Sequence, residues 1–369
     1  MENFSSLNHE DLLKRIEAAG LYAPESMTMM VTGGCNLHCN HCWLNCEDLE
    51  YSSPVAAEKV TGAIHEFTQL GGIQIKLTGG EILTHPDWPS IVRFGLDHAK
   101  IKHITLQTNA TLITPKHLAE LEKLQLDKLT IQVSLDGACA RSHDHVRGSG
   151  SFDDAMAGIN LLVEAGLGSR VQVAFTEMAH NFSELPDLLG SIHKLGIARL
   201  ISGTLVNGGR AAGSTQIRLP TPDQYRELIH LYRTDSEFRL LYDQKANISA
   251  IEWFKNRNAT AAEGCCSCLK NMFLDTRGAL YPCTMLLLER FASNSIYSRP
   301  MHLVIEESLS KWGRIPILSR KRQNTVKSCL QCADKQHCGG GCMGRAATVQ
   351  GELMAPEDRC SLRKAVYRC

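Results

Sequence analysis

The sequence predicts an α/β fold, in which a partial barrel of six strand–helix units precedes a small cysteine-rich domain. Short apolar runs rich in β-branched residues alternate with segments of helical periodicity over the first two thirds of the chain. Most of the 15 cysteines fall into two groups, one after the first predicted strand and one in the last third. Strands that alternate with helices form parallel sheets with right-handed crossovers.

The strand–helix units account for the first two thirds of the chain. We expect strands at about 26–32, 72–77, 102–107, 128–134, 170–176 and 198–205. Helices are expected between them at about 55–70, 87–99, 114–124, 152–165 and 182–195. Six units fit a partial TIM-like (β/α)6 barrel, whose functional groups belong at the C-terminal ends of the strands. The predicted segments are an N-terminal helical extension (1–25), the barrel (26–205), a helical linker (206–264) and the cysteine-rich domain (265–369).

The composition excludes several classes of protein. The 369 residues contain 39 Lys and Arg against 39 Asp and Glu, without a basic stripe that would indicate nucleic acid as a partner. The N-terminus has no apolar signal-peptide core, and no run reaches the roughly 18 apolar residues of a membrane span. We therefore expect a cytoplasmic protein that binds neither nucleic acid nor membrane, with cysteines that bind metal rather than form disulfides.

The first cysteine group follows the first predicted strand. Cys35, Cys39 and Cys42 have the spacing C-x3-C-x2-C, which gives three thiolates to a cluster of four irons and leaves one iron open. A zinc knuckle is the alternative, and Cys46 is expected to be a buried thiol. The loop resembles that of radical S-adenosylmethionine (SAM) enzymes. This resemblance implies that SAM chelates the open iron of a 4Fe–4S cluster and is cleaved to methionine and a 5′-deoxyadenosyl radical.

Further motifs follow later strands and extend the resemblance. LTGGE follows the second strand, QTNAT the third, and QVSLDGA with HDHVRG the fourth. In the family, the GGE backbone holds the SAM amino group, while the serine and arginine approach its carboxylate and ribose, for which a guanidinium fork is suited. The plainer alternative is that Asn109 and the Asp136-Gly137 pair only form turns and that Arg147 is only a surface charge. The implied SAM-binding residues are Gly79, Gly80, Glu81, Asn109, Ser134, Asp136 and Arg147.

The second cysteine group begins with Cys268 and Cys283 in the spacing C-x9-G-x4-C. It continues with C-x2-C-x5-C-x3-C from Cys329 to Cys342 and ends with Cys360. This pattern resembles the seven-cysteine signature of SPASM domains, with a zinc-binding tail as the alternative. The resemblance implies two auxiliary 4Fe–4S clusters. Cys268, Cys283 and Cys342 would ligate the first, together with Cys265 or Cys266, of which Cys265 fits slightly better by distance. If neither binds, that cluster would have an open iron. The second auxiliary cluster would be ligated by Cys329, Cys332, Cys338 and Cys360.

The resemblance implies a radical SAM/SPASM oxidoreductase that abstracts a hydrogen atom from its substrate. The family favours maturation of ribosomal peptides by a thioether, a C–C crosslink or an oxidation. Thr284 stands where sulfatase-maturing relatives carry a catalytic aspartate, which argues against formylglycine chemistry. Only residues 1–25 precede the barrel, so we expect either that a separate protein binds a leader peptide or that the substrate has no leader. The alternatives are tetrapyrrole or quinone cofactor biosynthesis and, from another class, a non-catalytic iron–sulfur electron-transfer protein. The expected electron donor is a flavodoxin or ferredoxin.

Overall fold

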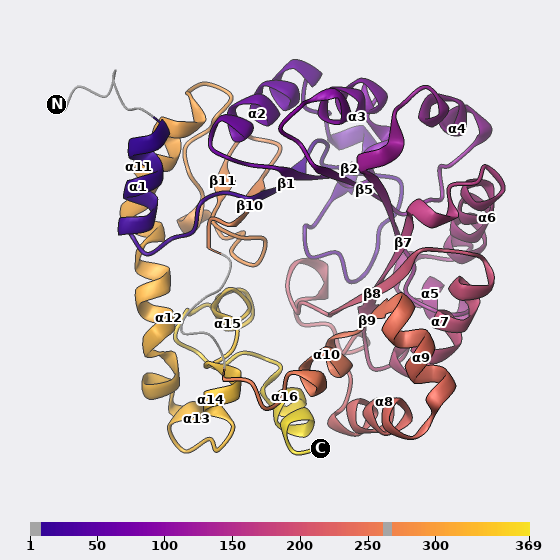
Figure 1. Ribbon diagram of the computed structural model, residues 1–369, viewed down its shortest axis with the longest axis vertical. Coiled ribbons are helices and arrows are strands. Elements are labelled where there is room, and N and C mark those ends of the chain that lie inside the picture. Colours follow the sequence, from indigo (N-terminus) through magenta and orange to yellow (C-terminus); the bar gives the residue numbers. More distant parts are fainter. Residues whose placement is uncertain (1–8, 261–267) are drawn as a thin grey trace.

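The computed structural model describes residues 9–260 and 268–369 (Figure 1). Within these residues the main sheet has the strand order β11-β10-β1-β4-β5-β6-β7-β8-β9. All six predicted barrel strands are confirmed, and each one pairs in parallel with the next. They are β1 (Ser26–Met30), β4 (Gln74–Thr78), β5 (His103–Thr108), β6 (Leu129–Ser134), β7 (Val171–Glu177) and β8 (Arg199–Thr204). Their parallel register brings their C-terminal ends to one face of the barrel.

Helices cover the outside of this curved sheet (Figure 1). The five predicted barrel helices are confirmed as α2 (Ala57–Gln69), α3 (Trp88–Asp97), α4 (Pro115–Glu122), α6 (Ser151–Glu164) and α7 (Leu185–Lys194). The segment predicted as a helical linker contains α8 (Pro222–Thr234) and α10 (Ser249–Lys255). The sequence analysis missed α5 (Ala140–Arg147) and α9 (Ser236–Lys245). Helix α5 was missed because its sequence, ARSHDHVR, is too polar to show apolar periodicity.

The strands alternate between an apolar outer face and a polar inner face. In β4, Ile75 and Leu77 are fully buried on the helix side, while Lys76 is exposed and Thr78 is half-buried. Strand β6 repeats the alternation, because every second residue of a strand points to the same side. TIM barrels are usually filled with Val, Ile and Leu. The polar inner residues of this barrel instead line an open cavity.

The sheet continues beyond the six barrel strands at both ends. At one end β9 (Ala246–Asn247) pairs with β8, and at the other β10 (Asn271–Leu274) pairs in parallel with β1. Strand β10 forms an antiparallel hairpin with β11 (Leu280–Tyr281). The sheet therefore runs across both predicted segment boundaries, at 205 and at 264.

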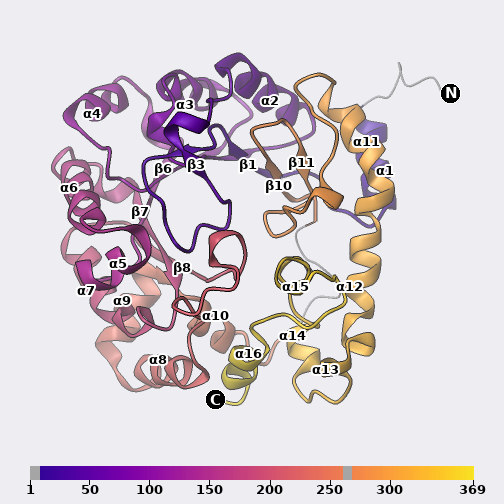
Figure 2. The ribbon, with the colours of Figure 1, turned by 180° about the vertical axis from the view of Figure 1, so that it is seen from behind.

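The C-terminal part of the chain lies across the side on which the barrel is open (Figure 2). Helix α1 (His9–Ala18) packs against α11 there, and α16 packs against α8 and α10. The helices of this part are α11 (Met301–Trp312), α12 (Arg314–Thr325), α13 (Lys327–Leu330), α14 (Lys335–Cys338), α15 (Met343–Gln350) and α16 (Cys360–Tyr367). Short 3₁₀ turns occur at Leu49–Tyr51, Ile82–Thr84, Leu126–Lys128, Gly168–Arg170, Phe182–Glu184, Gly209–Ala211 and Glu289–Phe291. None of the described helices is both long and apolar enough to cross a lipid bilayer.

One buried arginine joins the C-terminal part to the barrel. Arg345, on α15, is only 3% exposed and forms a two-pronged ion pair with Asp358, at 2.9 Å from Nε and 2.6 Å from Nη2. Its guanidinium also donates to the main-chain oxygens of Thr204, at 3.1 Å, and Leu205, at the end of β8. A fork of five donors is suited to hold a carboxylate and two carbonyls at once.

We expect Arg345→Met to destabilise the protein by about 3–5 kcal/mol, because it leaves the buried Asp358 carboxylate without its counter-charge. Urea unfolding under argon measures this effect. The matched control is Arg299→Met, which removes an equally two-pronged but half-exposed ion pair with Glu307. That change should cost about 1 kcal/mol or less. Equal unfolding midpoints for the two variants would contradict the anchoring role of Arg345.

Candidate functional site

The loop after β1 places its three cysteines at the C-terminal face of the barrel. Within this loop β2 (Gly34–Cys35) pairs with β3 (Glu47–Asp48) and closes the loop on itself. The thiols of Cys35, Cys39 and Cys42 line one cavity of about 230 Å³. Six of the seven predicted SAM-binding residues line the same cavity, namely Gly79, Gly80, Glu81, Asn109, Ser134 and Arg147. The seventh, Asp136, does not line it and is fully buried.

The turn after β4 requires glycine because two backbone segments approach each other closely. A Cβ atom at Gly80 would lie 2.1 Å from the carbonyl oxygen of Gly34, which no real contact allows. The Gly80 amide donates to Thr32 O at 2.8 Å, and the Glu81 amide donates to Gly34 O at 2.9 Å. These bonds fix the turn directly beneath Cys35, so that a ligand in the cavity meets backbone rather than side chain on this side.

The Glu81 carboxylate is bound by groups of the protein itself. It is 1% exposed and accepts hydrogen bonds from Thr108 Oγ1 at 2.7 Å, from the Asn109 amide at 2.7 Å and from the Leu83 amide at 3.0 Å. Burial raises its pKa, although these hydrogen bonds oppose the shift. The side chain thereby fixes the turn after β5. Asn109 can then donate to Asn36 Oδ1 at 2.9 Å and point its amide toward Cys35 Sγ, 4.0 Å away.

Asp136 lies behind the opposite wall of the cavity and holds residues of that wall in place. Its Oδ2 accepts from Arg147 Nε at 2.7 Å and lies 3.1 Å from His41 Nε2, and its Oδ1 accepts from the Thr176 amide at 2.6 Å. Burial alone would raise the pKa of Asp136, but Arg147, His41 and the hydrogen bonds outweigh it and hold the pKa well below its usual range. Arg147 is thereby held with Nη1 3.9 Å from Cys39 Sγ.

The three thiols provide a donor set that fits an iron–sulfur cluster. Burial raises the pKa of Cys35 to about 12 and also raises that of Cys39, whereas a hydrogen bond from the Cys46 thiol lowers the pKa of Cys42. No group of His, Cys, Asp or Glu side chains in the described ranges is placed to hold a single metal ion. In a cluster each thiolate binds a different iron, and cysteine sulfur is the ligand that such irons take.

Arg210, which no sequence motif indicates, holds the cysteine loop in place. Arg210 follows β8, and its Nε donates to Cys39 O at 2.8 Å while its Nη1 donates to Cys46 O at 2.6 Å. Its amide donates to Cys42 O at 3.0 Å. Gly209 allows this approach, since a Cβ there would lie 2.4 Å from Cys42 O. No local pattern identifies Arg210, because the cysteine loop that it binds lies more than 160 residues away along the chain.

Two glutamines were also missed, although strand periodicity contains a signal for them. Gln107 and Gln132 lie two residues before Asn109 and Ser134, and alternate residues of a strand share a face. Both line the cysteine cavity and a second cavity of about 430 Å³, which occupies the inside of the barrel. They therefore stand at the junction between the two cavities.

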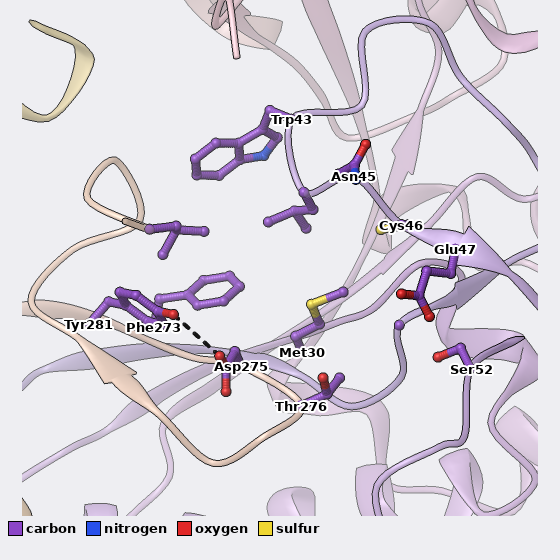
Figure 3. Close-up of a pocket in the computed structure, with 13 residues that line it drawn as sticks. Met30, Trp43, Asn45, Cys46, Glu47, Ser52, Phe273, Asp275, Thr276 and Tyr281 are labelled. Carbon is purple, nitrogen blue, oxygen red and sulfur yellow. Dashed lines mark hydrogen bonds between the residues drawn. The ribbon is translucent and has the colours of Figure 1, made fainter. Parts of the chain in front are cut away.

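A third cavity, of about 290 Å³, lies between the cysteine loop and the β10–β11 hairpin (Figure 3). Trp43 and Phe273 face each other across it and also line the barrel cavity, so the two spaces share a wall. Asp275 accepts a hydrogen bond from Tyr281 Oη at 3.3 Å, and its carboxylate also binds the amides of Arg277 and Ala279 at 2.9 Å. Asp275 therefore fixes the turn between β10 and β11.

The second cysteine group is partly assembled in the described residues. The four cysteines predicted for the second auxiliary cluster line one narrow cavity: Cys329, Cys332, Cys338 and Cys360. For the first cluster, the Leu269 amide donates to Pro282 O at 2.7 Å and so joins the segments that carry Cys268 and Cys283. The α15 helix, which follows Cys342, packs on the segment after Cys283, and Thr348 Oγ1 donates to Met285 O at 3.2 Å. Cys265 and Cys266 lie outside the described residues.

Comparisons with known proteins agree with this fold. The model of the Radical SAM superfamily matches residues 29–184. AdoMet-dependent heme synthase of Methanosarcina barkeri is 28% identical over 363 residues, which cover 92% of this chain and 97% of that protein. Mycofactocin maturase MftC of Mycobacterium ulcerans is 26% identical over 346 residues, which cover 92% and 89%. Streptococcus suis SuiB bound to precursor peptide SuiA superposes with a TM-score of 0.71 at 16% identity, over 98% of this chain and 83% of SuiB.

Proposed function

Because residues 29–184 form a radical SAM domain, we propose that this enzyme cleaves SAM at the Cys35–Cys42 loop and abstracts a hydrogen atom from a ribosomally made peptide. The observation that carries the proposal is the single cavity in which three thiols, the GGE turn, Asn109 and Arg147 meet. A non-catalytic electron-transfer protein has no need of such a cavity beside its thiols. When bound, the cluster and SAM supply the electron and the 5′-deoxyadenosyl radical.

The residues of this chain bind and orient the cofactors. Cys35, Cys39 and Cys42 would ligate three irons, and the GGE backbone would present its polar groups to the SAM amino group. Arg147, whose Nε is held by Asp136, keeps its remaining donors for a carboxylate or a ribose oxygen. Ser134 lines both the cysteine cavity and the barrel cavity, where it would stand between SAM and substrate. Trp43 and Phe273 would exclude water from the reacting carbon.

The second cysteine group would hold two further 4Fe–4S clusters, which gives three in all. Cys268, Cys283 and Cys342 with Cys265 or Cys266 would ligate one, and Cys329, Cys332, Cys338 and Cys360 the other. Clusters that bind distant segments stabilise a small domain that buries little apolar surface. They would also accept the electron that the substrate radical loses when the product forms. A flavodoxin or ferredoxin would supply the electron for SAM cleavage.

Two relatives favour different substrates. The similarity to mycofactocin maturase MftC supports a peptide, and the modification would be a thioether, a C–C crosslink or an oxidation. The similarity to AdoMet-dependent heme synthase, which extends over nearly the whole of both chains, favours a tetrapyrrole as the second candidate. Quinone biosynthesis is a further alternative, which neither of these two relatives supports.

The test measures 5′-deoxyadenosine after the reconstituted enzyme receives SAM and dithionite under argon. We expect formation above the level of SAM and dithionite alone. We also expect an increase when a short peptide encoded beside the gene is added, together with a mass change in that peptide. An increase with an iron coproporphyrin, and none with the peptide, would favour the tetrapyrrole. Cluster-replete enzyme that forms no 5′-deoxyadenosine with either substrate would contradict the proposal.

A further inference from the structure

The barrel cavity contains one lysine that the proposed chemistry does not use. Lys76 lies in the middle of β4, between the fully buried Ile75 and Leu77, whose side chains face the helices. Its own side chain lines the cavity of about 430 Å³. In the sheet, Lys76 pairs with Thr28 on β1 and with Thr105 on β5. A strand rises about 3.3 Å per residue, so Lys76 lies about 7 Å deeper in the barrel than Thr78, which lines both cavities.

The charge inside this cavity is unbalanced. Arg147 and His41 also line it, but both are bound to the buried Asp136 carboxylate. No Asp or Glu is among the described residues that line the cavity. The Lys76 ammonium makes no hydrogen bond or ion pair with any described residue, and it is exposed to the cavity. A ligand with a negative group would therefore meet a cation that has no competing partner.

Neutral amides lie between Lys76 and the cysteine cavity. Gln132 Oε1 accepts from Gln172 Nε2 at 3.3 Å, which leaves the Gln132 amino group free to donate to a ligand. Gln107 makes no side-chain hydrogen bond within the described ranges and offers both a donor and an acceptor. The cavity thus presents a cation at its deep end and amide groups nearer the SAM site. This order matches a chain of amide groups that ends in, or carries, a carboxylate.

We propose that Lys76 binds a carboxylate of the substrate and holds the reacting carbon a few bonds away, beneath the SAM site. The inference rests on the proposed function in so far as the barrel cavity is the substrate site. Two sources share this chemistry: the C-terminal or side-chain carboxylate of a peptide, and the propionate of a tetrapyrrole. The glutamines favour the peptide.

The experiment is isothermal titration calorimetry of the reconstituted, SAM-loaded enzyme under argon, without reductant. The first pair of probes is N-acetyl-triglycyl-alanine as the free acid and as its C-terminal carboxamide. Coproporphyrin III is the probe for the second source. The protein variants are Lys76→Met, Lys76→Arg and, as the matched control, Lys116→Met on the exposed surface of α4. Circular dichroism verifies that each variant folds.

We expect the free acid to bind at least about tenfold more tightly than the carboxamide, as one charge-assisted hydrogen bond provides. The preference should vanish in Lys76→Met, persist in Lys76→Arg and be unchanged in Lys116→Met. Binding of coproporphyrin III that depends on Lys76, without a preference between the peptides, would support the carboxylate site and assign it to a tetrapyrrole.

Three results would overturn the inference: equal binding of acid and carboxamide without Lys76-dependent porphyrin binding, a preference that persists in Lys76→Met, or no binding of any carboxylate probe up to about 10 mM. These results are separable from failure of the proposed function. Calorimetry without reductant requires no SAM cleavage, so an enzyme that forms no 5′-deoxyadenosine can still show the carboxylate preference.

Discussion

Replacing Cys35, Cys39 and Cys42 together by alanine reduces 5′-deoxyadenosine formation to the level of SAM and dithionite alone; this is the largest effect that we expect from any change in the chain. The three thiols line the same cavity, and among the described residues that line it the only further sulfur is that of Cys46. Without the three thiolates the loop has too few ligands to hold four irons. The measurement is chromatography of the reaction under argon, with the iron content of each protein as a second readout.

The control for this prediction is Cys139→Ala. Cys139 is exposed and lies outside both cysteine groups, so its removal should leave 5′-deoxyadenosine formation and iron content unchanged. The iron content of the triple variant should fall by the equivalent of one cluster, while the cysteines of the C-terminal part keep theirs. Undiminished 5′-deoxyadenosine formation by the triple variant would refute the assignment of this loop.

The second large effect is expected from Asp136→Asn. Asp136 is fully buried and is the counter-charge of Arg147, which is held against the cysteine loop. An asparagine loses the charge and retains one oxygen, and its NH2 group must face one of two donors, Arg147 or the Thr176 amide. Leaving a buried cation unpaired costs about 3–5 kcal/mol. We therefore expect a lower midpoint of urea unfolding, together with weaker SAM binding by calorimetry because Arg147 is no longer held in place.

The control is Asp127→Asn, which makes the same substitution at the surface. The Asp127 side chain is 94% exposed and pairs with Arg170 at 3.5 Å, and such a pair contributes about 1 kcal/mol or less. The ranking of the two variants is the test. If Asp127→Asn lowers the unfolding midpoint as much as Asp136→Asn does, the Asp136–Arg147 pair has no special part in holding the site together.

The barrel elements were predictable because their signals are local. The six strands and five barrel helices fall within two or three residues of the expected positions, since alternation of buried residues and helical periodicity repeat within each element. Helix α5 has few apolar residues in its sequence, and it is fixed by tertiary contacts of His143 and Val146, which are buried. Strand β9 has only two residues and owes its place to β8.

Most residues of the site could be predicted from the sequence, but the role of each side chain could not. Motif spacing identified Glu81 and Asp136, yet both carboxylates face the protein, where they position Asn109 and Arg147. Arg210 and Lys76 gave no motif. Arg210 matters because folding brings it to the distant cysteine loop. Lys76 matters because folding places it in the barrel cavity without a partner among the described residues.

The sequence by itself determined the order of strands and helices, the two cysteine groups and the turns that approach them. These features depend on neighbours a few residues apart, where periodicity and spacing are readable. Only the tertiary structure decided which charges are paired and which remain available to a ligand. Arg345 meets the end of β8 from about 140 residues away, and the polar inner face of six separate strands becomes one cavity. Such pairings arise when segments far apart in the chain pack together, and no local pattern records them.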